Sequence, residues 1–174
     1  MNTKENPTPG PAGTPGGTGV KPLGVLIAEH PFLKGMRSEH LQIMAECAMQ
    51  TRFEAGELIF REGDVANRFY LILEGEVALE SCVQDRGAVF VQAIGAGDVV
   101  GWSWLFPPYY WHFDARAVKP TRAIFLYGTR LREHCEADHD LGHELMKRMA
   151  EVIIKRLQAT RRQLLEVSDK PRAF

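Results

Sequence analysis

The sequence contains few cysteines, and they lie too far apart to act together. Only three occur among 174 residues, at Cys47, Cys82 and Cys135. An odd number at these spacings argues against a disulfide framework, and no Cys-x-x-Cys pair is available for a metal. The six histidines are scattered too, without the His-x-His or His-Glu-x-x-His spacing that places two ligands on one ion. We therefore expect reduced, mostly packed thiols and no metal site.

The sequence also lacks an excess of charge of either sign and any long apolar run. Its 21 basic and 22 acidic residues leave a formal net charge of −1, which gives no general attraction to nucleic acid or to an anionic membrane. No run approaches the ~20 apolar residues needed to span a bilayer. Residues 1–22 lack the basic start and apolar core of a signal peptide. These absences predict a soluble, cytoplasmic protein without a membrane partner.

Proline and glycine are concentrated at the start of the chain. Residues 1–22 hold five of each, between Thr, Asn and Lys, and this composition buries too little apolar surface to offset chain entropy. We interpret residues 1–22 as a disordered leader. Residues 23–30 then predict a short helix, and a second one begins at Ser38 with Leu41, Met44 and Cys47 at helical spacing. Both helices are expected to pack on the domain that follows.

Between about residues 52 and 127 the pattern changes to short apolar or alternating runs separated by glycine-containing turns. The runs recur at roughly the 8–12-residue spacing of sandwiches and barrels. They are LIF at 58, FYLIL at 69, VAL at 77, AVFVQAI at 88 and AIFLY at 123. Short strands joined by tight turns pair antiparallel, so the segment predicts an antiparallel β-roll or jelly roll. A short helix, LREHCEA, follows Gly128.

A long amphipathic helix is predicted over about residues 140–167, followed by a tail of residues 168–174. One stripe of the helix steps by four and three residues, as in a left-handed coiled coil. Its members are Met146, Ala150, Ile153, Leu157, Thr160, Leu164 and Val167. We predict a homodimer through this seam; the alternative is that the stripe packs on the roll of its own chain. The predicted fold class is therefore α+β, mainly β, with short N-terminal helices, the roll and a long C-terminal dimerisation helix.

The stretch FEAGELIFREGDVANRFYLILEGEVAL, residues 53–79, resembles the opening of the effector domain of the catabolite-activator and FNR-type regulators. The similarity includes Gly56-Glu57 before a strand, Gly63-Asp64 in a turn and Gly75 after the FYLIL run. It extends over about residues 28–167 and implies a cyclic nucleotide-binding domain at 23–167. A transcription factor would need a helix-turn-helix after the long helix. Only residues 168–174 follow, so we expect no direct DNA binding.

The resemblance also implies a phosphate-binding cassette. In the family, a Gly-Glu-Leu/Ile start is followed by an arginine and a small hydroxyl residue. The glutamate binds the ribose 2′-hydroxyl, and the arginine with helix-end N–H groups holds the cyclic phosphate. In this sequence the start reads Gly101, Trp102, Ser103, Trp104 and Leu105. Trp102 therefore stands where the family has glutamate.

The strand after the cassette sets the position of the missing arginine. Ala117 matches an alanine of the family, and counting back six residues places Trp111 where the arginine is expected. Using Arg116 instead would leave the next strand too short. The resemblance therefore predicts that the cassette arginine is absent, while Arg156 and Thr160 on the long helix match positions from which family members reach toward the nucleotide.

An aromatic cluster replaces the missing polar groups. Seven of the chain's sixteen aromatic residues fall within residues 102–113, around Pro107-Pro108. Three interpretations stay open: core that fills the vacated pocket, stacking on a different planar ligand, or an exposed anchor patch for a protein partner. His112 and Asp114 also lie here, without the nucleophile and oriented base that catalysis needs. The candidate ligand-binding residues are Gly101, Trp102, Ser103, Trp104, Trp111, His112, Arg156 and Thr160.

These patterns favour a non-enzymatic regulatory or sensor module with a divergent cassette, acting by dimerisation and partner docking. The alternative is a genuine sensor of a cyclic nucleotide or another small ligand that uses the aromatic-rich pocket. Jelly-roll enzymes that use a metal need clustered His and Glu ligands on adjacent strands, and the β region supplies no such pair. The sequence predicts no enzyme activity and names no certain cofactor, the candidates being a cyclic nucleotide or another small ligand.

Overall fold

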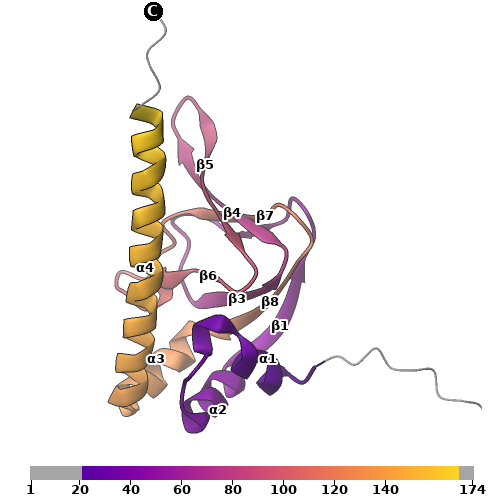
Figure 1. Cartoon of the computed structure of the whole chain (residues 1–174), viewed down its shortest axis with the longest axis vertical. Helices are drawn as coiled ribbons and strands as arrows, with labels where there is room; N and C mark the ends of the chain where they lie inside the picture. Colours follow the sequence, from indigo (N-terminus) through magenta and orange to yellow (C-terminus); the bar gives the residue numbers. More distant parts are fainter. Residues whose placement is uncertain (1–20, 169–174) are drawn as a thin grey trace, which may run out of the picture.

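The computed structural model describes residues 21–168, in which a β-roll carries helices at one end and along one side (Figure 1). The leader predicted for residues 1–22 and the tail predicted for 168–174 lie almost entirely outside these residues. The helices are α1 (Leu23–Glu29), the 3-10 helix η1 (Pro31–Leu33), α2 (Ser38–Glu46), the 3-10 helix η2 (Trp102–Trp104), α3 (Gly128–Ala137) and α4 (His139–Ser168). The strands are β1 (Ala48–Phe53), β2 (Leu58–Phe60), β3 (Arg68–Glu74), β4 (Glu76–Val83), β5 (Gly87–Gly95), β6 (Val99–Val100), β7 (Asp114–Ala117) and β8 (Thr121–Tyr127).

The roll consists of two four-stranded antiparallel sheets. Their strand orders are β1-β8-β3-β6 and β2-β7-β4-β5. The turn between β3 and β4 links the two sheets at Gly75, whose φ is +94°. A Cβ at this position would lie 2.5 Å from the carbonyl oxygen of Pro120, so only glycine allows the two backbones to approach so closely.

The first sheet separates two apolar cores because side chains alternate between its faces. Its inner face packs against the second sheet, with Tyr70, Ile72 and Ala123 among the buried residues. Its outer face carries Phe69 and Leu71, which pack against the N-terminal helices, α3 and the first half of α4. The fold is therefore mainly β with helices on one face, which confirms the predicted class.

The junction between α3 and α4 is fixed by Asp138. Its carboxylate accepts hydrogen bonds from the backbone N–H groups of Asp140 (3.0 Å) and Leu141 (3.1 Å), which α4 leaves without helical partners. The bond from Leu141 is the main reason that the pKa of Asp138 lies below its usual value. Buried His40 of α2 contacts the other carboxylate oxygen at 3.1 Å. The start of α4 is thereby tied to the N-terminal helices.

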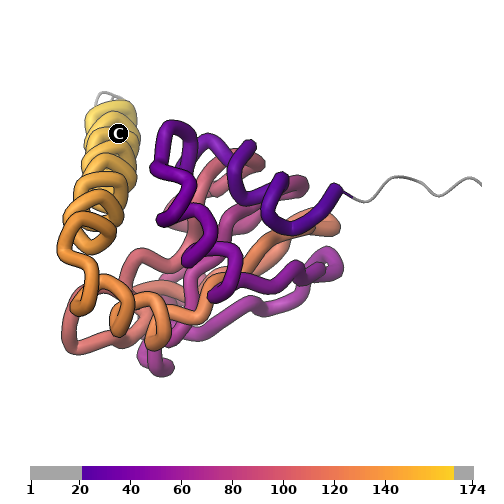
Figure 2. Tube along the Cα trace, turned by 90° about the horizontal axis from the view of Figure 1, so that it is seen from below, coloured from indigo at the N-terminus to yellow at the C-terminus, as the bar shows by residue number. Residues whose placement is uncertain are grey.

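Helix α4 presents different residues to its own chain and to solvent. Leu141, Leu145 and Met149 are fully buried in the helix-side core. Most of the predicted seam is exposed instead, including Met146 (52%), Leu157 (68%) and Leu164 (65%). Ile153 and Thr160 are half-buried, and the side chain of Val167 lies outside the described residues. Figure 2, which looks nearly along α4, shows the helix at the edge of the molecule.

The structure differs from the predicted elements at the first strand and in its short elements. The first strand begins at Ala48 rather than near residue 52, because the exposed residues Met49 and Gln50 hide its start in the sequence pattern. The short 3-10 helix η1 was not predicted, since three residues are too few for a periodic signal. The long helix predicted at about 140–167 spans His139–Ser168.

Candidate functional site

The segment predicted as the cassette begins at the end of β6, where the indole ring of Trp111 packs against its first residue, Gly101. Gly101 follows β6 with φ of +92°, and a Cβ there would lie 2.7 Å from the ring of Trp111. Trp111 is only 5% exposed and stacks on Phe60 with ring centroids 3.9 Å apart. Its backbone pairs with the turn at residues 63–64: Trp111 N–H donates to Asp64 O, and Gly63 N–H donates to Trp111 O, both at 2.9 Å. The indole is therefore held firmly against Gly101.

Further rings continue from this contact into the roll. Phe60 stacks on Tyr70 at 6.0 Å, and Tyr70 meets the edge of Phe53 at the same distance. Burial raises the pKa of Tyr70, as expected for a phenol in an apolar interior. Trp111 is consequently the outer member of a row of aromatic rings that continues through Phe60 to Tyr70 and Phe53.

Trp102, Ser103 and His112 form a second group at the surface side of the cassette. The half-buried Trp102 stacks on the exposed His112 with centroids 5.0 Å apart. Ser103 is 3% exposed, and its Oγ shares a hydrogen bond with Nδ1 of His112 at 2.9 Å. The side chain of His112 is thus in contact with two neighbours from the same segment.

Trp104 points the other way, into the helix-side core. It is fully buried and stacks on Phe69 with centroids 4.9 Å apart. Its carbonyl oxygen accepts a hydrogen bond from Nη1 of Arg132 at 2.5 Å, and the same guanidinium lies 4.3 Å from the ring centroid of Tyr109. Arg132 of α3 therefore holds the segment of Trp104 and Tyr109 in place through these two contacts. The sequence pattern does not indicate this role.

Arg116 does not reach the roll interior. Its neighbours on β7, Ala115 and Ala117, are fully buried and face the core, so alternation directs Arg116 outward. There its Nε donates to Glu80 at 3.2 Å and its Nη1 donates to the carbonyl oxygen of Gly56 at 3.0 Å. This arginine is already bound on the outside of the roll.

Arg156 lies in a cleft between α4 and the roll. Its Nη2 donates to the carbonyl oxygen of Val99. Burial lowers the pKa of this arginine to about 10, and the negative charge of Asp98 partly opposes the shift. The cleft, which we call the basic cleft, has a volume of about 300 Å³. Its lining is Gln92, Ile94, Asp98, Val152, Lys155, Arg156, Gln158, Ala159 and Arg162. Thr160 is half-buried on the next turn of α4 and does not line it.

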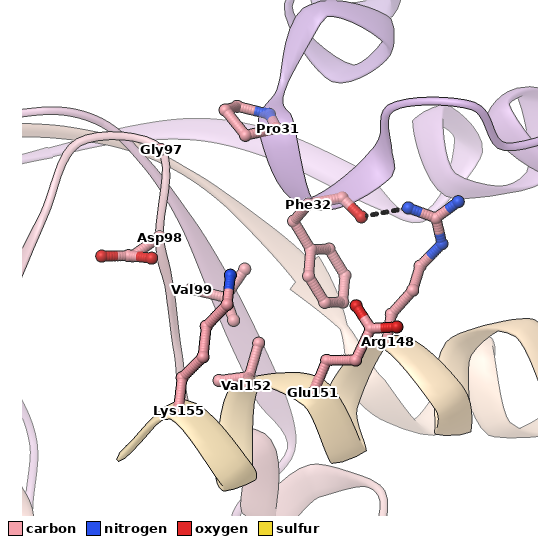
Figure 3. Close-up of a pocket in the computed structure, with 9 residues that line it drawn as sticks. All are labelled: Pro31, Phe32, Gly97, Asp98, Val99, Arg148, Glu151, Val152 and Lys155. Carbon is pink, nitrogen blue, oxygen red and sulfur yellow. Dashed lines mark hydrogen bonds between the residues drawn. The ribbon is translucent and has the colours of Figure 1, made fainter. Parts of the chain in front are cut away.

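A neighbouring cleft lies between η1, the β5–β6 turn and α4 (Figure 3). Arg148 stands on one side of it and donates hydrogen bonds to the carbonyl oxygens of Phe32 (2.6 Å) and Lys34 (3.1 Å) and to Glu144 (2.7 Å). Of the two cations that line this cleft, Arg148 is thus engaged in holding α4 to the N-terminal helices, and Lys155 also lines the basic cleft.

The predicted ligand residues therefore fall into separate groups. Gly101 and Trp111 lie together, as do Trp102, Ser103 and His112, whereas Trp104 and Arg156 belong to other surroundings. Within residues 21–168 no group of three or more His, Cys, Asp or Glu side chains is placed to hold a metal ion. Over the same residues, no helix combines the length and apolar character that crossing a membrane requires.

Comparisons with known proteins give matches in the same region. The sequence model of the cyclic nucleotide-binding domain matches residues 50–138. A cAMP-dependent protein kinase regulatory subunit of Schizosaccharomyces pombe is 32% identical over 76 residues, covering 44% of this chain and 18% of its own. The CRP-like cAMP-activated global transcriptional regulator of Mycobacterium tuberculosis is 20% identical over 142 residues, which cover 82% of this chain and 62% of the regulator. This chain therefore spans less than two thirds of these relatives.

Solved structures share the fold. A cyclic nucleotide-binding protein of Geobacter metallireducens superposes with a TM-score of 0.69 at 31% identity, over 79% of this chain and 98% of that one. The regulatory subunit of a cAMP-independent protein kinase A from Trypanosoma brucei superposes with a TM-score of 0.60 at 26% identity. The match covers 73% of this chain and 45% of that one. The catabolite activator protein of Thermus thermophilus superposes with a TM-score of 0.61 at 21% identity, over 79% of this chain and 63% of that one. Since the domain model covers just over half of the 174 residues, and the two-sheet roll with its long helix matches these structures, this chain belongs to the cyclic nucleotide-binding domain family.

Proposed function

We propose that this chain is a non-enzymatic regulatory module whose phosphate position is closed by Trp111, and that it acts by dimerisation and docking to a protein partner in the cytoplasm. The observation that carries this proposal is the contact between Trp111 and Gly101. The indole occupies the place of the cassette arginine, is 5% exposed and is stacked on Phe60. A phosphate would have to displace the ring.

The energetic consequence is large compared with a typical nucleotide affinity. A charge-assisted contact to phosphate contributes about 1.5–3 kcal/mol, and the 2′-hydroxyl bond lost at Trp102 adds about 1 kcal/mol. Together these losses weaken binding by roughly two decades or more. The structural relative from Trypanosoma brucei is described as part of a cAMP-independent kinase, so a regulatory role without cAMP has a parallel among similar folds.

The exposed seam of α4 supports dimerisation. Met146, Leu157 and Leu164 are all more than half exposed in the single chain, and their heptad spacing is that of a two-stranded coiled coil. The residues that pack on the roll are different ones, so the seam is free to meet a second copy. We infer a parallel homodimer through residues 140–167.

A second candidate function is the sensing of a small planar ligand. The stacked pair of Trp102 and His112 favours it, because the half-buried indole and the exposed imidazole offer aromatic surface at the edge of the cassette. Such a ligand would bind by stacking and would not need the missing arginine.

Titration of the wild-type protein with cyclic AMP and cyclic GMP tests the closed cassette. All three tryptophans lie between residues 102 and 111, so intrinsic fluorescence reports on this segment without a label. We expect no saturable change at micromolar nucleotide. A saturable change at low-micromolar cyclic nucleotide, absent with the linear monophosphate, would overturn the proposal. Saturation with an unrelated planar compound, and not with cyclic nucleotides, would favour the second candidate.

A further inference from the structure

The basic cleft carries more positive charge than its own residues neutralise. Lys155, Arg156 and Arg162 line it together with a single carboxylate, Asp98. Lys155 and Arg162 are exposed, and neither has an ion-pair or hydrogen-bond partner among residues 21–168. Because Arg156 is already bound to Val99 O, it forms part of the wall, and the two unpaired cations are left for a ligand.

The two cations are arranged on one face of α4. Lys155 and Arg162 lie seven residues, or about 10 Å of helix axis, apart, and Val152 and Ala159 share their face. Their side chains are long enough to converge on an anion between them. Gln92 and Ile94 of β5 form the opposite wall, so the cleft offers an amide and an apolar surface as well.

Figure 3 shows the neighbouring cleft, which shares Asp98, Val152 and Lys155 with the basic cleft. Lys155 rises from α4 beside Val99, and the carboxylate of Asp98 points away from Phe32 and Arg148. In the neighbouring cleft Arg148 is bound to carbonyl oxygens and to Glu144. Lys155 therefore stands at the border of the two clefts, whereas the unpaired Arg162 lines the basic cleft and not its neighbour.

We propose that the basic cleft binds a small dianion, a phosphate ester or a dicarboxylate, through Lys155 and Arg162. The bound anion bridges the roll to the second half of α4. This site goes beyond the closed cassette and does not involve Trp111. It also leaves the dimer seam free, because the cations lie on a different face of the helix from Leu157 and Leu164.

Citrate and pyrophosphate are suitable probes, and isothermal titration against sodium chloride of matched ionic strength measures their binding. We expect saturable binding to the wild-type chain near or below about 1 mM. Lys155→Gln and Arg162→Gln each remove one charge-assisted contact and should weaken it about tenfold. Asp98→Asn removes the opposing charge and should tighten it.

Arg161→Gln is the matched control, because it removes the same charge from the adjacent position of α4, outside the cleft. It should bind the probes as the wild type does. Equal weakening in Arg161→Gln, or unchanged affinity in both cleft variants, would mean general charge attraction and would overturn the proposal.

On the wild type alone, the side-chain amide signals of Gln92 and Gln158 should shift in NMR spectra on addition of citrate. Absence of any saturable signal in both measurements rejects the site while leaving the closed cassette untouched.

Discussion

The contact between Gly101 and Trp111 places two separate demands on residue 101. Its φ of +92° costs a residue with a side chain about 1–2 kcal/mol. Its Cβ would also lie 2.7 Å from a ring that stacks on Phe60, so the ring or the backbone must move. We expect Gly101→Ala to lower the free energy of unfolding by about 3 kcal/mol or more, as measured by urea denaturation.

Gly63 is the matched control for this substitution. It has a comparable φ of +85°, but a Cβ there would meet no atom within 4 Å. Gly63→Ala should therefore show the backbone cost alone, about 1–2 kcal/mol. Equal losses in the two variants would show that the indole does not press on residue 101.

Single residues also show what the sequence could and could not predict about the site. The resemblance to the family, counted back six residues from Ala117, predicts Trp111 at the arginine position, and this assignment stays a prediction. Nothing in the sequence distinguished Trp104 from Trp102, although one lies in the helix-side core and the other on the surface side. Their directions depend on the 3-10 turn that Gly101 starts, and such a turn has no periodic signal.

The short element η1 depends on a buried histidine. His30 is 3% exposed; its Nδ1 accepts a hydrogen bond from Phe32 N–H, and its Nε2 donates to the carbonyl oxygen of Ile72 at 3.2 Å. Burial is the main cause of the lowered pKa of His30, opposed by the bond to Ile72 and by Asp98. The ring is therefore neutral in the folded chain over a pH range in which the unfolded chain binds a proton.

This difference predicts a loss of stability in mild acid. As pH falls below about 6.5, the unfolded state takes up a proton that folded His30 does not, so the free energy of unfolding decreases by up to about 1.4 kcal/mol per pH unit. The loss stops at the lowered pKa of the folded state. Urea denaturation at a series of pH values from about 7.5 to about 5, which brackets the titration range of histidine, measures this loss of stability.

His30→Asn separates this residue from the other titrating groups. The amide keeps an acceptor for Phe32 N–H but does not bind a proton. The variant should be less stable than the wild type at neutral pH and should lose less stability on acidification. Parallel pH profiles for the two proteins would assign the acid sensitivity to other residues.

Among the elements, the ones with strong repeats were predictable and the irregular ones were not. Glycine turns at regular spacing indicated the roll, and the seam of α4 indicated a long helix. Strand β6 has two residues and η1 has three, which is too few to show the repeat of a strand or of a helix in the sequence. The basic cleft was also missed, because it forms only where β5 and α4, which are far apart in the sequence, meet.

For the molecule as a whole, the proposed dimer makes one clear prediction. Leu157 is 68% exposed at the centre of the seam. Leu157→Asp would bury an unpaired charge in the coiled coil, which typically costs about 3–5 kcal/mol, and should convert the dimer to monomers. Light scattering at micromolar concentration measures the change in mass.

Gln158→Asp provides the matched control on the same helix. It introduces the same side chain one position further along, on the face that borders the basic cleft. This variant should remain dimeric. A monomeric wild type, or dissociation of both variants alike, would contradict assembly through the seam.

The separation of the two faces of α4 has a consequence for how such a chain diverges. Leu141, Leu145 and Met149 must fit the volume of one roll, whereas in the proposed dimer the seam has to fit only another helix. After gene duplication, the seam can therefore change its pairing preference without disturbing the fold. A family of copies with one conserved roll can in this way sort into distinct homodimers and heterodimers, each presenting the same domain to a different assembly.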